Sequence, residues 1–305
     1  MKKRRYGTSP TKRRNRAQMA ELLGAIHEIL DAETSAITIR HLFYRLVGLN
    51  VIPKAELAYK GLCGHLSRWR KSREVPYHAF SDSTRWHIKP PMYDGIEDAL
   101  RRTRESYRRD LWASQSHYTE VWVEKDAIAG VIADVTSEWG VPLFVCRGFA
   151  SLSSMYSASL TFKEAQERVK EVTIFHLGDY DPSGHAAADA IERAFRERFD
   201  CSINFQRIAI LPEQIEDFNL PTRPTKQSDS RARRWRGSEC VELDSMPPSG
   251  LRSLVENAIT SLIDWYEWEQ LKQIERAERE TLERTLSGFT ASQNRENGDE
   301  LPSPF

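Results

Sequence analysis

From about residue 117 the chain alternates short apolar segments with longer amphipathic ones. The segments YTEVWVEKD, VPLFVCRG, VTIFHLGD and INFQRIAIL are typical of strands, and each segment between them has helical periodicity. Strands that alternate with helices form crossover units, which place the strands parallel in one sheet. The sequence therefore predicts an α/β fold over residues 117–215, with a parallel sheet sandwiched by helices.

Carboxylates stand at the ends of two of these predicted strands. Glu124 closes the first strand, and Asp179 and Asp181 follow the third. In parallel sheets, ligands bind at the carboxyl ends of the strands. Pro182 and Gly184 predict a turn that lets both aspartates face one ion. Three carboxylates at one sheet edge favour a hard cation, so we expect Glu124, Asp179 and Asp181 to bind Mg²⁺.

Residues 17–95 have a different pattern, in which three helical segments precede an alternating one. Apolar residues recur at helical spacing after Arg16, and a second helix begins after Thr38, a suitable N-cap. The third segment ends in HLSRWRKSR, and VPYHAFSDSTRW then indicates a hairpin. This order is typical of a winged-helix DNA-binding domain, whose third helix lies in the major groove. A small structural bundle with a solvated basic helix is the alternative.

The charge distribution supports a polyanion-binding N-terminal part. The formal net charge is zero, yet residues 1–110 hold 23 Lys and Arg against 12 Asp and Glu. The acidic excess therefore lies in residues 111–305. Residues 1–16 predict a disordered basic arm. On the third helix, we expect the DNA backbone to be contacted by Arg68, Arg70, Lys71 and Arg73.

The remaining segments connect or extend these two parts. Residues 96–116 predict a linking helix, residues 216–287 a C-terminal extension with a long helix to about Leu286, and residues 288–305 a disordered tail. The segment DSRARRWRG at 229–237 is either an exposed basic loop near DNA or an ordinary solvated loop.

Several classes of protein are excluded by what the sequence lacks. No stretch of 18 apolar residues occurs, and no apolar segment follows the basic N-terminus, so we expect neither a membrane span nor a signal peptide. The four cysteines have no CxxC spacing, which favours a reducing, cytoplasmic compartment over a zinc ribbon or disulfide framework. No GxxxxGK[ST] motif is present, so the chain predicts no nucleotide-driven motor of its own.

The segments EVWVEKDAIAG, FVCRGFASLSS and IFHLGDYDPSG together resemble a Toprim domain. With the segment Arg40-His41-Leu42-Phe43-Tyr44, they are similar to the A subunit of topoisomerase VI and the meiotic double-strand-break transesterase. The resemblance covers roughly residues 17–215. In its overall form the chain looks like the small Mini-A topoisomerases of plasmids and phages, and the region after 211 departs from the full-length pattern.

This resemblance implies a specific chemistry. Tyr44 would be the nucleophile that breaks a DNA strand, Arg40 would assist it from one helical turn away, and Mg²⁺ would be the cofactor. The family further implies a homodimer in which Tyr44 of one chain meets the metal site of the other. Both strands would then be cut and resealed through 5′-phosphotyrosyl links, with a separate ATPase subunit as a further partner.

Two other functions agree with the same residues. A hydrolytic Toprim nuclease would use water in place of Tyr44, and a non-catalytic DNA-binding factor would need no metal. Tyr44 itself has a plain structural interpretation as a core aromatic beside Leu42, Phe43 and Leu46.

Overall fold

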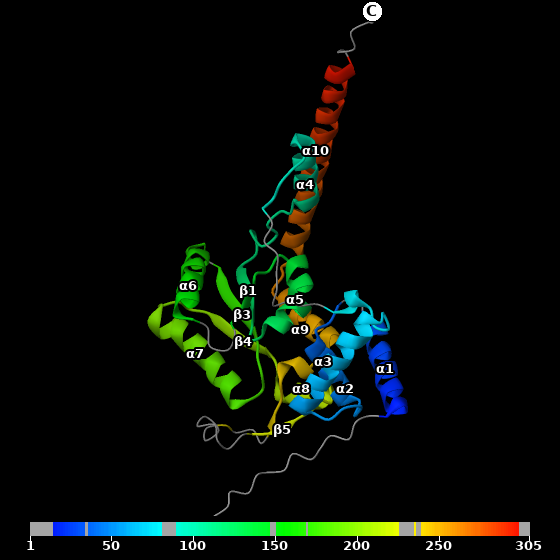
Figure 1. The fold of residues 1–305 in the computed structure, drawn as a ribbon. Helices are drawn as coiled ribbons and strands as arrows, with labels where there is room; N and C mark the ends of the chain where they lie inside the picture. The colour runs from blue at the N-terminus through cyan, green and yellow to red at the C-terminus, as the bar shows by residue number, and fades with distance from the viewer. Residues whose placement is uncertain are drawn as a thin grey trace, which may run out of the picture.

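The computed structural model describes residues 15–33, 36–80, 90–146, 151–168, 170–225, 235 and 239–298, with side chains as far as residue 289. Figure 1 shows a group of N-terminal helices beside a sheet with helices on both faces, and a long C-terminal helix that projects from them. None of the helices in this described part combines the length and hydropathy needed to cross a bilayer.

The sheet has four strands, and every neighbouring pair is parallel. Its spatial order is β2-β1-β3-β4. The strands are β1 (His117–Val123), β2 (Leu143–Val145), β3 (Glu171–Leu177) and β4 (Asn204–Ala209). The crossover helices are α5 (Asp126–Glu138), α6 (Leu152–Glu167) and α7 (Pro182–Arg198). The expected α/β architecture with a parallel sheet between helices is therefore confirmed.

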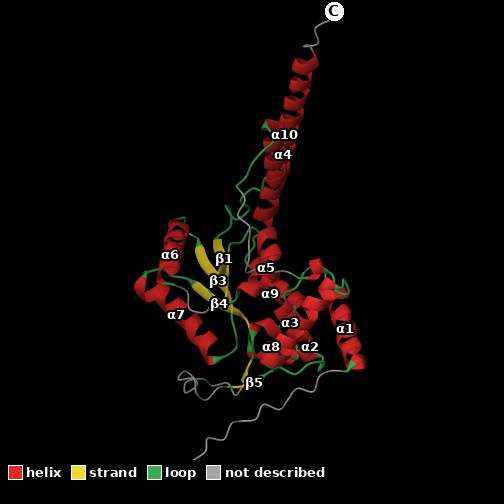
Figure 2. Cartoon of the chain, viewed as in Figure 1, coloured by secondary structure: helices red, strands yellow, loops and turns green. Residues whose placement is uncertain are grey.

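The two faces of the sheet bury different layers of side chains, because successive residues of a strand point to opposite faces. Trp122 packs with Phe162 and Phe195 of helices α6 and α7. Val121 and Val123 lie in the other layer, which α5 and a C-terminal helix, α9 (Pro248–Thr260), cover. Figure 2 shows these helices on either side of the strands.

Helix α9 belongs to residues 216–287, which the sequence-based boundary at residue 215 separated from the α/β unit. Its Leu251 and Val255 belong to the same core as Val121 of β1 and Phe175 of β3, so this boundary does not divide two cores. The chain between the sheet and α9 contains α8 (Pro212–Asp217), β5 (Arg223–Pro224), β6 (Glu239–Cys240) and the 3₁₀ turn η3 (Leu243–Ser245). The C-terminal region thus completes the α/β unit.

The N-terminal helices α1 (Arg16–Asp31), α2 (Ile39–Gly48) and α3 (Glu56–Lys71) have a core of their own. Thr38 caps α2 as expected, because its hydroxyl accepts a hydrogen bond from the backbone of His41 at 3.2 Å. The expected hairpin is not seen in its described part. Tyr77–Ala79 form the 3₁₀ turn η1, and Phe80 makes a single parallel bridge with Ile37. Residues 81–89 lie outside the described residues, so the winged helix stays a prediction.

Helices α4 (Ile96–Ser106) and α10 (Trp265–Gly298) lie side by side and project from the rest (Figure 1). Tyr107 donates a hydrogen bond to Glu278 at 2.6 Å, and Arg104 pairs with Glu283. Two sequence-based boundaries were wrong here. The linking helix ends at Ser106, short of residue 116, and the long helix continues past Leu286 through residues assigned to a disordered tail. Helix α4 packs along α10 and stabilises it, although the apolar pattern of α10 alone predicts this helix only weakly.

Residues 1–14, 147–150 and 299–305 lie outside the described residues, so most of the predicted arm is not placed, and its last two residues, Asn15 and Arg16, cap and begin α1. The basic segment 229–237 also lies outside the described residues, except Trp235. The ring of Trp235 lies edge-on to Tyr180 and His185, with both centroid distances at 4.8 Å.

Gly184 offers a test of the turn that follows β3. A Cβ at this position would overlap the backbone carbonyl of Asp179. We expect Gly184→Ala to lower the free energy of unfolding by about 1–3 kcal/mol, measured by urea denaturation. Gly64 occupies an exposed position of α3, where a Cβ meets nothing within 4 Å, so Gly64→Ala should instead raise the free energy of unfolding by about 0.5–1 kcal/mol. Equal stability of Gly184→Ala and wild type would contradict this packing.

Candidate functional site

A cluster of charged side chains lies where α2, the ends of β1 and β3, and the segment before η3 meet. Val241 is carried to the sheet edge by an antiparallel bridge with Tyr180, in which each backbone N–H donates to the other carbonyl at 2.9 Å. This bridge brings the following Glu242 and Asp244 to the strand ends. We call the cluster the junction site, and it comprises Arg40, Tyr44, Glu124, Lys125, Asp179, Glu242 and Asp244.

Glu124 and Asp179 lie together, as neighbouring parallel strands require. The backbone N–H of Asp179 donates to Glu124 Oε2 at 2.9 Å, and Asp179 Oδ1 accepts from the backbone of Leu243 at 2.8 Å. Burial, and then the negative charge of Asp179, raises the pKa of Glu124. The two carboxylates present hard oxygen donors of the type that Mg²⁺ prefers.

Asp181 has a different environment from the other two predicted ligands. Its Oδ1 accepts from the backbone of Gly184 at 2.8 Å, which caps α7, and its Oδ2 lies 3.3 Å from Arg223. Within the described residues, no three His, Cys, Asp or Glu side chains gather closely enough to hold a metal ion. The structure thus brings Glu124 and Asp179 together, whereas Asp181 caps α7 and contacts Arg223.

Lys125 is the cation that contacts the carboxylates. Its Nζ lies 2.8 Å from Asp179 Oδ1 and 2.7 Å from Asp244 Oδ2. Burial alone disfavours an ammonium, but the charges of Asp179 and Asp244 raise the pKa of Lys125 above its ordinary value. Lys125 therefore stays charged and joins the sheet edge to the C-terminal segment.

Tyr44 and Arg40 project into the cluster from α2. The Tyr44 hydroxyl donates to Glu242 Oε2 at 2.5 Å, and Arg40 Nη2 lies 2.7 Å from the same oxygen. Arg40 Nε also lies 3.2 Å from Asp244 Oδ2. The ring of Tyr44 is buried in the N-terminal core against Phe43. The ring is therefore a core aromatic, as the structural interpretation expected, while the hydroxyl reaches the site.

The surroundings keep the Tyr44 hydroxyl protonated. Burial, followed by the hydrogen bond to Glu242, raises the pKa of Tyr44 well above the ordinary value of a phenol. The pKa of Glu242 shifts in the opposite direction. Burial opposes its charge, but the Tyr44 hydroxyl, Lys125 and Arg40 together lower its pKa to about 2. The phenol is the donor and the carboxylate is the acceptor in this pair.

The hydroxyl meets carboxylates of its own chain. Tyr44 contacts Glu242, Glu242 Oε2 lies 3.8 Å from Lys125, and Lys125 contacts Asp179. The family resemblance implied that Tyr44 would instead meet the metal site of a second chain. In the single chain, the nucleophile candidate and the sheet-edge carboxylates already share one cluster.

Sequence analysis missed Lys125, Glu242 and Asp244 as members of this site. The segment VELD does place two carboxylates at the end of a short apolar run, as the predicted strands do. That signal is weak, because only the pairing of Val241 with Tyr180 shows that this run reaches the same sheet edge.

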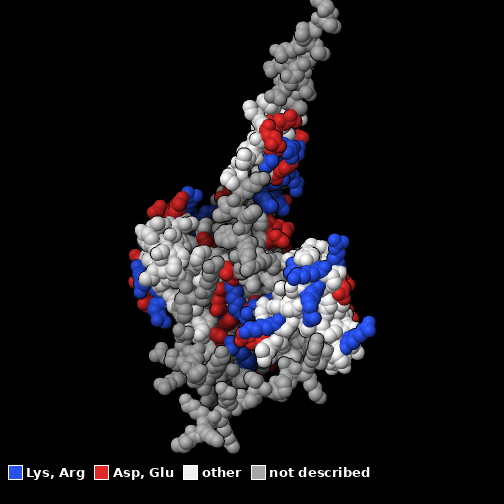
Figure 3. Space-filling view, in the orientation of Figure 1, with Lys and Arg blue, Asp and Glu red and all other residues white. Residues whose placement is uncertain are grey.

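The predicted DNA-contacting side chains differ in their surroundings. Arg70 lies over the rings of Tyr77 and Phe80, at 4.8 and 5.5 Å from their centroids, so it packs the end of α3. Arg68 contacts His65, and the remaining two, Lys71 and Arg73, are exposed. Figure 3 shows Lys and Arg side chains scattered over this helical part, and mixed charges where it meets the sheet.

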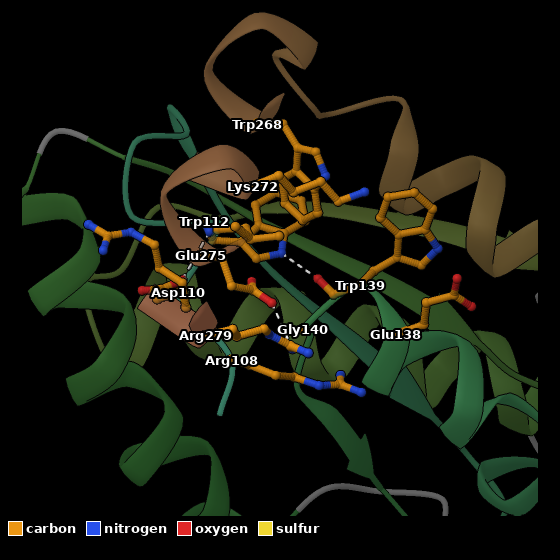
Figure 4. Close-up of a pocket in the computed structure, with 12 residues that line it drawn as sticks. Arg108, Asp110, Trp112, Glu138, Trp139, Gly140, Trp268, Lys272, Glu275 and Arg279 are labelled. Carbon is orange, nitrogen blue, oxygen red and sulfur yellow. Dashed lines mark hydrogen bonds and ion pairs between the residues drawn. The ribbon is translucent and has the colours of Figure 1, made fainter. Parts of the chain in front are cut away.

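A cavity of about 570 Å³ lies elsewhere, at the base of the α4 and α10 pair (Figure 4). Two contacts join groups that line it. Trp112 Nε1 donates to the carbonyl of Trp139 at 2.7 Å, and Arg279 pairs with Glu275 at 2.7 Å. No residue of the junction site lines it.

No protein-family model matches the chain, and no curated protein matches it.

The low pKa of Glu242 predicts how acid affects stability. A carboxylate whose pKa falls from 4.5 to about 2 on folding stabilises the protein above pH 4.5, and this contribution disappears as the pH falls to about 2. We expect Glu242→Gln to cost up to about 3 kcal/mol at pH 7, with the difference from wild type shrinking between pH 4.5 and 2. Urea unfolding at several pH values measures it.

Glu239→Gln is the matched control, because it removes one negative charge at an exposed position three residues earlier. A stability difference between Glu242→Gln and wild type that stays constant down to pH 3 would show that the Glu242 ion pairs do not have this effect.

Proposed function

We propose that the chain is a Mg²⁺-dependent DNA strand transesterase, similar in chemistry to the type IIB topoisomerases. The observation that supports this is the contact of the Tyr44 hydroxyl with Glu242 at 2.5 Å, within a cluster that continues through Lys125 to Asp179. A hydroxyl nucleophile, cations and sheet-edge carboxylates are the groups that strand transfer to tyrosine needs.

In the proposed reaction, the Tyr44 oxygen forms a bond to the phosphorus of a DNA phosphodiester. The bond from phosphorus to the 3′ oxygen breaks, the phenolic proton is lost, and the 3′ hydroxyl leaves with a proton. One phosphate ester replaces another, so the break can be resealed by the reverse reaction. Arg40, one helical turn from Tyr44, stabilises negative charge on the phenol and on the phosphate.

Glu124, Asp179 and Asp181 would hold Mg²⁺, which would neutralise charge on the phosphate when bound. Glu124 and Asp179 already lie together, and Asp181 would have to exchange its contact with Arg223. Lys125 supplies positive charge beside Asp179 in the chain as described. Two chains acting together would cut both strands of duplex DNA and leave Tyr44 on the 5′ ends, with a separate ATPase subunit driving the change in DNA topology.

Hydrolysis is the second candidate, and one observation favours it. The raised pKa of Tyr44 and its hydrogen bond to Glu242 leave the phenol a poor nucleophile in this arrangement. A nuclease would direct water from the carboxylates Glu124 and Asp179 to the phosphate, without Tyr44.

The plasmid cleavage assay distinguishes these functions. Supercoiled plasmid is incubated with the protein and Mg²⁺, then denatured with detergent, with and without protease. A transesterase leaves protein on the DNA ends, a nuclease leaves unlinked ends, and a non-catalytic binding factor leaves the plasmid intact. EDTA should abolish either cleavage reaction.

Tyr44→Phe is the decisive variant. The ring and its packing remain, so the variant should fold, with a loss of about 1.5–3 kcal/mol from the missing hydrogen bond to a charged carboxylate. It should form no covalent adduct with DNA, whereas Tyr59→Phe, on the neighbouring helix α3, should form adducts like wild type. Adducts formed by Tyr44→Phe would place the nucleophile elsewhere, and unlinked cleavage by both wild type and Tyr44→Phe would favour hydrolysis.

DNA binding by the end of α3 has a separate test. We expect Lys71→Ala/Arg73→Ala to reduce the slope of log K against log salt by about 0.9 for each phosphate contact that is lost. The double variant Lys163→Ala/Arg168→Ala removes the same charge from exposed positions at the C-terminal end of α6 and should keep the wild-type slope. An unchanged slope in the α3 variant would exclude this end of the helix as a DNA contact.

A further inference from the structure

Glu242 is a single carboxylate with cations on several sides. Arg40 Nη2 lies 2.7 Å from Oε2, Lys125 Nζ lies 3.8 Å from the same oxygen, and Arg223 Nε lies 3.9 Å from Oε1. The hydroxyl of Tyr44 donates to Oε2 as well. These groups come from α2, the end of β1 and β5, so the tertiary fold builds a convergent anion-binding arrangement around one side chain.

The Glu242 carboxylate does not pair closely with all of these cations. Its Oε2 accepts from Tyr44 and Arg40, whereas its Oε1 lies 3.9 Å from the nearest cation among the described residues, Arg223. Arg223 Nε is buried and makes no hydrogen bond to any described residue. A phosphodiester has the same charge as a carboxylate, but its two unbridged oxygens are farther apart and suit the planar fork of an arginine.

The position of Tyr44 identifies which anion belongs here. A nucleophile must face its reacting atom at about 3–3.5 Å in a productive complex. The group that contacts the Tyr44 hydroxyl in this structure is the Glu242 carboxylate, so this carboxylate occupies the place that a phosphate must enter.

We propose that Arg40, Lys125, Arg223 and Tyr44 form a binding site for a backbone phosphodiester of DNA, and that Glu242 fills this site in the DNA-free chain. The proposal rests on the proposed function for the role of Tyr44. DNA must then displace Glu242, and the apparent affinity is reduced by the fraction of chains in which the site is filled. Removing the charge of Glu242 opens the site.

Binding without metal tests this directly. A short fluorescent duplex is titrated in EDTA with wild type, Glu242→Gln and the matched control Glu239→Gln, and its anisotropy is measured. We expect Glu242→Gln to bind about tenfold more tightly than both other proteins, because the competing anion is gone while the cations remain. Binding by Glu242→Gln that is no tighter than by Glu239→Gln overturns the proposal.

Glu242→Asp keeps the charge among the cations and shortens the side chain, so it serves if Glu242→Gln does not fold. Withdrawal of the carboxylate from Tyr44 should tighten duplex binding in the same direction by a smaller factor, and unchanged binding overturns the proposal. Inorganic phosphate gives a second readout. It should raise the melting temperature of Glu242→Gln and not that of Arg40→Ala/Glu242→Gln, and equal shifts in both count against the site.

These measurements involve no cleavage, so the two proposals fail separately. Tighter binding by Glu242→Gln supports the phosphate site, even where no variant cuts plasmid in Mg²⁺ and the transesterase function is lost. Cleavage by wild type without tighter binding by Glu242→Gln supports the function and overturns the site.

Discussion

The ion pairing of the half-buried Lys125 ammonium is the interaction on which the arrangement of the site depends. The ammonium contacts Asp179 at the end of β3 and Asp244 in η3, whose side chain is fully buried. A buried charge costs several kcal/mol unless other charges and hydrogen bonds compensate it. Removing Lys125 takes a cation from both Asp179 and Asp244. The sheet edge and the C-terminal segment are therefore held in one geometry.

The same ion-pair network attaches the N-terminal helices to the sheet. Arg40 reaches both Asp244 and Glu242, and Lys54 Nζ donates to the carbonyl of Pro221 at 3.0 Å. The N-terminal core and the two cores of the sheet are separate clusters of apolar residues. The contact between them is thus largely polar at the site.

Comparison of sequence and structure shows which features are encoded locally. The alternation of strands and helices predicted the parallel sheet, because the period of apolar residues reports local structure and crossovers impose parallel strands. The same reasoning placed Glu124 and Asp179 at one edge of the sheet. In the structure, the backbone N–H of Asp179 donates to Glu124 Oε2 at 2.9 Å. Thr38 marked the start of α2 for an equally local reason, since its hydroxyl accepts from the backbone three residues later.

Tertiary structure decided the rest. Glu242 and Asp244 enter the site because Val241 pairs with Tyr180, far away in the sequence, and no local pattern specifies that partner. Helix α10 packs along α4 and continues beyond Leu286 to Gly298, although its own sequence has few apolar residues to mark it. Sequence by itself determined the sheet, the helices and two carboxylates, because these depend on neighbours along the chain. The contact of Lys125 with Asp244 and the carboxylate that faces Tyr44 depend on which distant segments pack together, and only the folded chain specifies them.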